Sequence, residues 1–249
     1  MSATYKIALY ELINEIEKKH FWFQARNVLL QKLIIRYIPK PKEVSFLEVG
    51  FGTGAVIGLL EKMGFRVTGI DINKKALMYA RKQCRAPLFQ SSIFTFTSKK
   101  RFAAVGAFDV MEHIFADVKF LKHIHKLLAP AGLLFLTVPA HRWLWSKLDT
   151  LSGHKHRYSI KELEEKLKRS GFSLVFWNYW QAVTLPIFWL WRKIMIQEKQ
   201  ETIENYLAAP PALINKLLYF ILLFEQMFFF RIKFPIGGSI VICAKRGHN

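Results

Sequence analysis

The chain has 249 residues, of which 52% are hydrophobic, which fits one elaborated domain and excludes a disordered chain. Its two cysteines, Cys84 and Cys243, stand far apart, so neither a disulfide framework nor a cysteine-based zinc site is expected. The net charge is +19, yet the mean hydropathy is +0.14. A basic chain that is also rich in Phe and Trp favours an anionic membrane surface over nucleic acid as a partner, although many cytoplasmic enzymes are simply basic.

Residues 5–38 carry apolar side chains at close to helical spacing, which predicts one or two helices that Pro39 and Pro41 end. Residues 1–19 mix Glu and Lys and have no apolar run, so we expect no signal peptide and a cytoplasmic location. Strands and helices then alternate. We predict helices at 55–62, 74–83, 118–128 and 161–169 and strands at 44–49, 66–70, 87–90, 103–110, 133–138, 172–179 and 239–244. This alternation predicts a parallel sheet with helices on both faces.

The last two predicted strands are separated by about 60 residues, whereas most connections have about 4–6. This connection contains two apolar, aromatic stretches with basic flanks, 185–196 and 212–230. We expect an insertion that packs as a second core layer or rests on a membrane. The domain boundaries follow: an N-terminal helical cap at 1–41, the core at 42–180, the insertion at 181–236 and the final strand with its tail at 237–249.

A glycine-rich turn follows the first predicted strand and opens a helix, in the sequence Glu48-Val49-Gly50-Phe51-Gly52-Thr53-Gly54. Glycine allows a sharp turn and close approach of a ligand, and the helix N-terminus offers free N–H groups. Asp71 stands after the second strand, where a carboxylate accepts the hydroxyls of a ribose. The spacing Gly50-x-Gly52-x-x-Ala55 fits a nicotinamide dinucleotide loosely. Glu48 favours a cationic sulfonium nucleoside instead, because a carboxylate would repel a pyrophosphate.

The spacing Glu48-x-Gly50-x-Gly52-x-Gly54 resembles motif I of the class I S-adenosylmethionine-dependent methyltransferases. Three further segments are similar to motifs of that family: Gly69–Ile72, Phe108–Ile114 and Leu128–Leu134. Together they extend over about residues 20–180 and the last strand. The resemblance implies an α/β, Rossmann-like sheet of seven strands whose final strand is antiparallel and lies beside the sixth. It also implies S-adenosylmethionine as the cofactor.

The resemblance implies a set of cofactor-binding residues: Arg26, Glu48, Gly50, Phe51, Gly52, Gly54, Asp71, Ile72, Ser92, Ile93 and Asp109. One position departs from the family pattern. The third strand usually ends near an Asp that holds the adenine amino group, and here Ser92 stands in as a neutral acceptor. Arg26 belongs to the segment before the first strand, where a helix closes over the cofactor in similar proteins. Its charge suits the methionine carboxylate, and a solvated helix face is the alternative.

Two polar regions are candidates for the chemistry. Glu112 and His113 follow the fourth strand, at the sheet edge where ligands bind, and a histidine titrates near neutral pH. The long loop after the fifth strand resembles that of a bacterial methyltransferase subgroup linked to envelope glycan or lipid pathways. It supplies His141 as a tentative catalytic residue and a set of candidate acceptor-binding residues: Arg142, Trp143, Trp145, His154, Arg157 and Tyr158. His-x-His spacing alone is weak support for a metal, so no metal site is expected.

Methyl transfer to an oxygen of a small, glycan or lipid-linked acceptor is therefore the leading hypothesis. A non-catalytic, membrane-associated module of the same fold is the second, with Ser92 as its one hint. An RNA methyltransferase is suggested only by charge, and no Asn/Asp-Pro-Pro-Tyr motif follows the fourth strand. Nucleic acid is thus an unlikely partner, whereas peripheral contact with the inner face of a membrane is expected.

Overall fold

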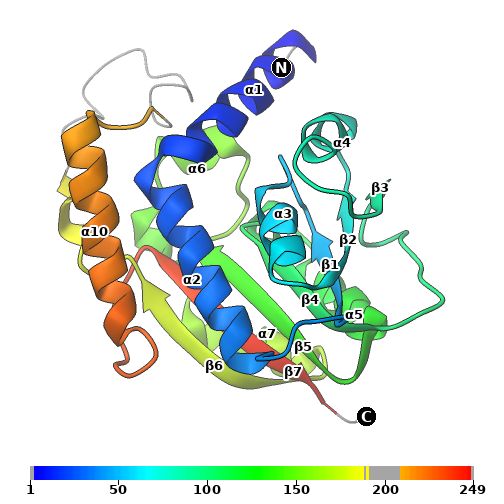
Figure 1. Cartoon of the computed structure of the whole chain (residues 1–249). Coiled ribbons are helices and arrows are strands. Elements are labelled where there is room, and N and C mark those ends of the chain that lie inside the picture. Colours follow the sequence, from blue (N-terminus) through cyan, green and yellow to red (C-terminus); the bar gives the residue numbers. More distant parts are fainter. Residues whose placement is uncertain (1–2, 188, 191–207, 248–249) are drawn as a thin grey trace.

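A computed structural model describes residues 3–187, 189–190 and 208–247. These residues form a seven-stranded sheet in the order β3-β2-β1-β4-β5-β7-β6 (Figure 1). Neighbouring strands from β3 to β5 are parallel, and β7 runs antiparallel to both β5 and β6. The expected fold, with an antiparallel final strand beside the sixth, is confirmed. The strands are Ser45–Val49 (β1), Arg66–Asp71 (β2), Leu88–Gln90 (β3), Phe102–Phe108 (β4), Leu128–Pro139 (β5), Phe172–Trp180 (β6) and Ser239–Arg246 (β7).

Helices cover both faces of the sheet and bury two separate hydrophobic clusters. One cluster joins the sheet to α5 and α7, through side chains such as Phe120 and Leu163. The other joins it to α2, α3, α4 and α10, through side chains such as Leu33 and Leu222. The α-helices are Ala3–Lys19 (α1), Phe21–Tyr37 (α2), Ala55–Lys62 (α3), Lys74–Ala80 (α4), Asp117–Leu127 (α5), Lys147–Ser152 (α6), Ile160–Arg169 (α7) and Ala212–Phe228 (α10).

The predicted N-terminal helical segment is two helices, because His20 interrupts it. His20 has an extended backbone, and its side chain accepts a hydrogen bond from the Trp22 N–H, so it caps the N-terminus of α2. The interruption lets α1 leave the direction of α2 (Figure 1) and contact α4 and the glycine turn. Helices α1 and α2 therefore contribute to the site described below.

Two element boundaries differ from the sequence prediction by three residues or more, whereas the others differ by two at most. Helix α4 ends at Ala80 instead of residue 83, because the chain tightens into a turn there. Strand β5 begins at Leu128 instead of residue 133. Residues 130–132 lie within the strand, where the pairing with β4 shifts register between Phe102 and Ala104, and Ala131 takes a positive φ of 59°. A bulge of this kind accommodates extra residues without ending the strand.

Within the insertion, α10 packs against α2 (Figure 1). The buried Gln226 side chain donates a hydrogen bond of 2.7 Å to the Ala25 carbonyl, and Glu225 accepts hydrogen bonds from the Gln181 and Val183 N–H groups. The expected apolar stretch 185–196 lies largely outside the described residues. Among the helices that are described, none combines the length and the apolar character needed to cross a bilayer.

Candidate functional site

The glycine turn lies at the carboxyl end of β1, between that strand and α3. Gly50, Gly52 and Gly54 all have positive φ, at 74°, 54° and 91°. A Cβ added at Gly52 would meet nothing within 4 Å, so this glycine serves the backbone conformation and leaves its outer side open. Open backbone next to a helix N-terminus is a binding surface for polar ligand groups.

Asp71 ends β2 beside this turn and is held by the backbone. Its Oδ2 accepts a hydrogen bond of 3.0 Å from the Gly52 N–H, and its Oδ1 accepts one of 2.8 Å from the Asn73 N–H. Burial raises the pKa of Asp71, and these two N–H groups oppose that rise. Each carboxylate oxygen retains a second acceptor site, so the group is oriented and still able to bind hydroxyls.

Glu48, in β1, is a buried carboxyl group with an unsatisfied atom. It is 3% exposed, and its Oε2 has no hydrogen-bond partner among the described residues. Burial raises its pKa well above the ordinary value, and the positive charge of Arg26 opposes this only in part. A buried acceptor without a partner is costly, so a cationic ligand at this position would stabilise the ionised form.

Arg26 reaches the same region from α2. Its Nη1 lies 2.8 Å from Oδ2 of Asp109 at the end of β4, and its guanidinium lies over the rings of Trp22 and Phe23, at 5.1 and 5.5 Å from the centroids. The Arg26 Nε is buried and has no partner in the described part of the chain. The structure thus pairs Arg26 with Asp109, two residues predicted separately to bind the cofactor, and rejects the solvated-face alternative because Arg26 is 8% exposed.

Sequence reasoning missed Glu17 and Thr53. Glu17, near the end of α1, accepts a hydrogen bond from the Thr53 hydroxyl in the glycine turn. Burial raises the pKa of Glu17, and the charge of Arg26 opposes the rise. Nothing in the local sequence of α1 signals this contact, since Glu17 is one of several charged residues in an otherwise ordinary helix.

Glu112 lies just past β4 and is enclosed by the loop after β5. The Lys155 N–H donates a hydrogen bond of 2.7 Å to its carbonyl. Its carboxyl group is 1% exposed, and Oε2 has no partner among the residues that the structure describes. Burial, followed by the negative charge of Asp109, raises its pKa well above the ordinary value. The structure therefore brings together the two regions that the sequence proposed for chemistry.

His154 stands between Glu112 and Asp149. Its Nδ1 is 2.9 Å from Asp149 Oδ1, and its Nε2 is 4.0 Å from Glu112 Oε1. Burial opposes ionisation of Asp149, but hydrogen bonds from His154 and Arg157 and the charge of Arg157 hold its pKa below the usual range. The ring of His113 packs edge-on against His154 with centroids 4.9 Å apart. Desolvation, followed by the neighbouring His154, lowers the pKa of His113.

The sequence suggests Asp149 only as a possible metal ligand, and it is absent from the predicted catalytic and acceptor-binding residues. It forms a capping box with Ser146 at the start of α6, and the Ser146-x-x-Asp149 spacing is the sequence signal that could have revealed it. The Glu112, His113 and His154 side chains bring three potential ligand atoms within 4.8 Å of one another. Of the described residues, these three are the group that could hold a metal ion.

Two predicted acceptor-binding residues, Arg157 and Tyr158, are buried and hydrogen-bonded within the protein. Arg157 is 6% exposed, and its nitrogens donate to both Asp149 oxygens and to the Ala140 carbonyl. Tyr158 is fully buried, and its hydroxyl donates to the Met111 carbonyl. Both side chains face inward because the loop is anchored to the end of β4 and to Ala140. Their role is to fix the loop that positions Asp149.

The other predicted residues are spread around this centre. His141 stacks on Tyr179 with centroids 4.8 Å apart, and its Nε2 is buried without a partner in the described part of the chain; burial lowers its pKa. Arg142 forms an exposed ion pair with Glu162 at 3.5 Å. Ser92 caps the turn after β3 by accepting from the Phe94 N–H, and Ile93 is buried beside it. Three predicted apolar side chains are largely exposed, those of Ile72, Trp143 and Trp145.

Comparison with known proteins gives a consistent result. A family model described as a methyltransferase domain matches residues 21–175. A probable S-adenosylmethionine-dependent methyltransferase of Mycolicibacterium smegmatis is 23% identical over 172 residues, which cover 64% of this chain and 62% of that protein. A ubiquinone biosynthesis O-methyltransferase of Methylocella silvestris is 30% identical over 107 residues, which cover 40% of this chain and 42% of that protein. The chain thus spans less than two thirds of the length of these relatives.

Among solved structures, the [4+2]-cyclase SpnF has the same fold, with a TM-score of 0.66 at 17% identity. The similarity covers 99% of this chain and 94% of the cyclase. The shared architecture includes the helices outside the sheet, although at this identity it supports the fold alone.

Proposed function

The chain belongs to the methyltransferase-domain family, and on this premise we propose that it transfers the methyl group of S-adenosylmethionine to an oxygen of a small, glycan or lipid-linked acceptor. The observation that carries the proposal is Glu48, a buried carboxyl group without a partner among the described residues, beside an open glycine turn. When bound, the cofactor supplies a methyl group on a positively charged sulfur, which is already activated for displacement.

The residues at the turn fit this cofactor. Glu48 would accept the ammonium of the methionine moiety, because this removes the cost of its unsatisfied Oε2. Asp71, held by two backbone N–H groups, would accept the ribose hydroxyls. Arg26 would bind both Asp109 and the methionine carboxylate in this arrangement. Its Nε is buried, and the described residues offer it no acceptor, which supports binding to the methionine carboxylate.

His154 is the base that the geometry favours. Asp149 stays ionised and orients the ring through Nδ1, so the lone pair of the neutral ring lies on Nε2, on the side facing Glu112. A hydroxyl acceptor beside Nε2 would give its proton to this nitrogen, while the bound cofactor would supply the methyl group that the acceptor oxygen receives. This proposal gives His154 the role that the sequence suggested for His113, which packs against it.

Kinetics of paired variants test this assignment. We expect His154→Gln and Asp149→Asn to lower kcat by about 10²- to 10⁴-fold, while the dissociation constant of S-adenosylhomocysteine changes less than about threefold. His123→Gln, at a half-buried position of α5 where the ring packs against Phe94, is the matched control and should keep full activity. If His154→Gln retains kcat and His113→Gln loses it, the base is His113. If no methyl is transferred into small-molecule, glycan or lipid extracts by the unaltered protein, the methyltransferase proposal itself fails.

The lipid-linked acceptor is supported by one surface. Along α10, five large apolar side chains at helical spacing are between 54% and 81% exposed: Leu213, Leu217, Phe220, Phe224 and Met227. We call this the apolar face of α10. Exposed Lys216 and Arg231 accompany it, and the chain carries a net charge of +19. An apolar helix face with basic neighbours suits the surface of an anionic bilayer, where a lipid-linked acceptor would be found.

Vesicle flotation tests this surface. The unaltered protein should float with vesicles that contain anionic phospholipid, and the double variant Leu217→Gln, Phe224→Gln should remain in solution. Met78→Gln with Val175→Gln removes exposed apolar side chains from other elements and should leave flotation unchanged. Equal loss in both double variants, or no flotation of the unaltered protein, would count against membrane contact and leave the cofactor proposal intact.

A further inference from the structure

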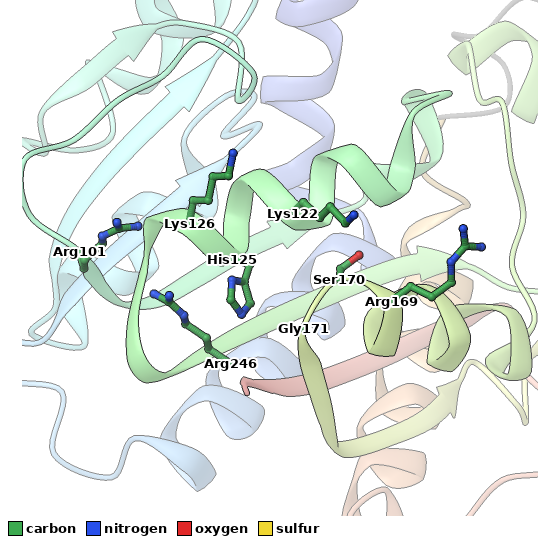
Figure 2. A pocket seen from close by; sticks show the side chains of 8 residues that line it. All are labelled: Arg101, Lys122, His125, Lys126, Arg169, Ser170, Gly171 and Arg246. Atoms are coloured by element: carbon green, nitrogen blue, oxygen red, sulfur yellow. The ribbon is translucent and has the colours of Figure 1, made fainter. Parts of the chain in front are cut away.

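A basic cavity lies at the edge of the sheet opposite the glycine turn. It has a volume of about 330 Å³, which is at the lower end of the range for small-molecule pockets. Its titratable lining is entirely basic: Arg101, Lys122, His125, Lys126, Arg169 and Arg246. Figure 2 shows these side chains, which come from the residue before β4, from the second half of α5, from the last turn of α7 and from the end of β7. We call this cavity the cationic pocket.

The position of the cationic pocket follows from the topology. Arg101 precedes β4, which is parallel to β1, whereas the glycine turn follows β1. Arg246 ends β7, which is antiparallel to β5. The cationic pocket therefore lies at the edge where the parallel strands begin, and the proposed cofactor site lies where they end.

The charges of the cationic pocket are not neutralised within the described part of the protein. Five of its lining residues are arginine or lysine, and no carboxylate lines it. None of the five lies within 4.0 Å of a carboxylate among the residues that the structure describes. Five such cations around one cavity repel one another. An anion placed among them would remove this repulsion.

Helix dipoles explain only part of this arrangement. Lys126 and Arg169 stand in the last turns of α5 and α7, where a cation is favourable. Arg246 donates one hydrogen bond to the Leu128 carbonyl at the end of α5. Arg101 precedes a strand, and Lys122 lies before the last turn of its helix. Helix dipoles therefore give no reason for Arg101 and Lys122 to line the same cavity.

His125 adds a buried polar atom to the wall. It is 7% exposed, and its Nε2 makes no hydrogen bond of good geometry with the described residues. Burial, followed by the charge of Arg246, lowers the pKa of His125, although the backbone of Gly171 and Gly247 opposes this. A neutral imidazole that carries its proton on Nε2 can donate to a ligand oxygen without adding another charge to the pocket.

We propose that the cationic pocket binds the phosphate group of a phosphorylated ligand, with Arg101, Lys122 and Arg246 as its principal charged contacts. Arginine and lysine are the side chains that bind phosphate oxygens through charge-assisted hydrogen bonds. The phosphate belongs either to a soluble phosphorylated molecule or to a lipid headgroup, and both present the same oxygens. The volume leaves room for more than the bare anion.

Calorimetric titration of the full chain with inorganic pyrophosphate tests the soluble source. We expect Arg101→Gln with Lys122→Gln to weaken binding at least tenfold. Lys42→Gln with Lys62→Gln removes the same charge from exposed positions elsewhere and should weaken it less than twofold. Equal weakening in both double variants would mean a general charge effect and would overturn the site.

Vesicles of phosphatidylcholine with and without phosphatidic acid test the lipid source, using the same two double variants. Retention that depends on phosphatidic acid and is lost only in the pocket variant assigns a headgroup phosphate. Binding of pyrophosphate alone assigns a soluble ligand. If the unaltered protein binds neither probe at near-physiological ionic strength, the proposal is wrong. Because neither measurement involves methyl transfer, failure here leaves the proposed enzymatic function unaffected.

Discussion

Beside the glycine turn, one side chain favours ligand binding at the expense of the stability of the fold. Glu48 is buried, and the described residues offer no partner for one of its oxygens. This costs folding free energy, yet the same property prepares it for a cationic ligand. Asp71 contrasts with it, because two backbone N–H groups already satisfy part of its acceptor capacity. Ligand affinity and fold stability should therefore respond in opposite directions at Glu48.

Glu48→Gln tests this opposition. We expect the dissociation constant of S-adenosylmethionine to rise by about ten- to hundredfold, because a hydrogen bond to a charged group contributes about 1.5–3 kcal/mol. The free energy of unfolding should rise, since a buried acid with a raised pKa is replaced by a neutral side chain. Calorimetry and chemical denaturation measure the two quantities. Glu165→Gln, on the exposed surface of α7, should change neither, and equal affinity in Glu48→Gln would contradict the proposed contact.

His20 provides a pH-dependent contribution to stability. Burial lowers its pKa to about 4, from 6.5 in the unfolded chain. Between pH 4 and pH 6.5 the unfolded chain binds the proton more readily than the folded protein does. The contribution of neutral His20 to the free energy of unfolding is therefore present above about pH 6.5 and is lost as the pH falls toward 4. His20→Asn keeps a side-chain acceptor for the α2 N-cap. Denaturant unfolding measures the fall in the free energy of unfolding between pH 7 and pH 4.5. This fall should be about 1–2 kcal/mol larger in the unaltered protein than in His20→Asn. Equal falls would exclude His20 as the source.

Among the elements, the turns depend on glycine for two separable reasons. Gly54, which begins α3, has a φ of 91°, and a Cβ there would lie 2.6 Å from the Ala80 Cα of α4. Gly153, which ends α6, has a φ of 79° with nothing within 4 Å of its added Cβ. A larger residue at Gly54 would therefore have both backbone strain and a steric clash, whereas one at Gly153 would have backbone strain alone.

Alanine substitutions at Gly54 and Gly153 separate the cost of backbone strain from the cost of the steric clash. Gly153→Ala should lower the free energy of unfolding by about 1–2 kcal/mol, the cost of a left-handed conformation. Gly54→Ala should lower it by about 2–5 kcal/mol, because overpacking adds to the strain. Chemical denaturation measures both. Equal losses would show that α4 moves away from α3 at little cost.

At the scale of the whole molecule, helix α10, near the end of the chain, packs against helix α2, near its beginning. Helix α10 buries Leu222 in the cluster that contains α2 and presents Leu217 to solvent at 58% exposure. The Phe21 N–H also donates to the Asn215 side chain of α10. Residues about 190 positions apart therefore form one layer over the sheet, which places α10 beside the helix that carries Arg26.

The two faces of α10 should respond differently to the same change. Leu222→Ala should lower the free energy of unfolding by about 2–5 kcal/mol, the usual cost of a core cavity. Leu217→Ala should change it by less than about 0.5 kcal/mol. Chemical denaturation provides both values, and a large loss at Leu217 would mean that this face is covered in solution.

The sequence by itself determined the sheet, the order of its elements and the glycine turn, because hydrophobic periodicity, turn residues and the Glu48–Gly54 spacing are local patterns. Only the tertiary structure decided which polar residues face each other. Glu17 reaches Thr53, Asp149 orients His154, and Arg157 turns inward. These pairs join separate segments of the chain, and their geometry depends on how the helices and loops pack around the sheet, which no local pattern records.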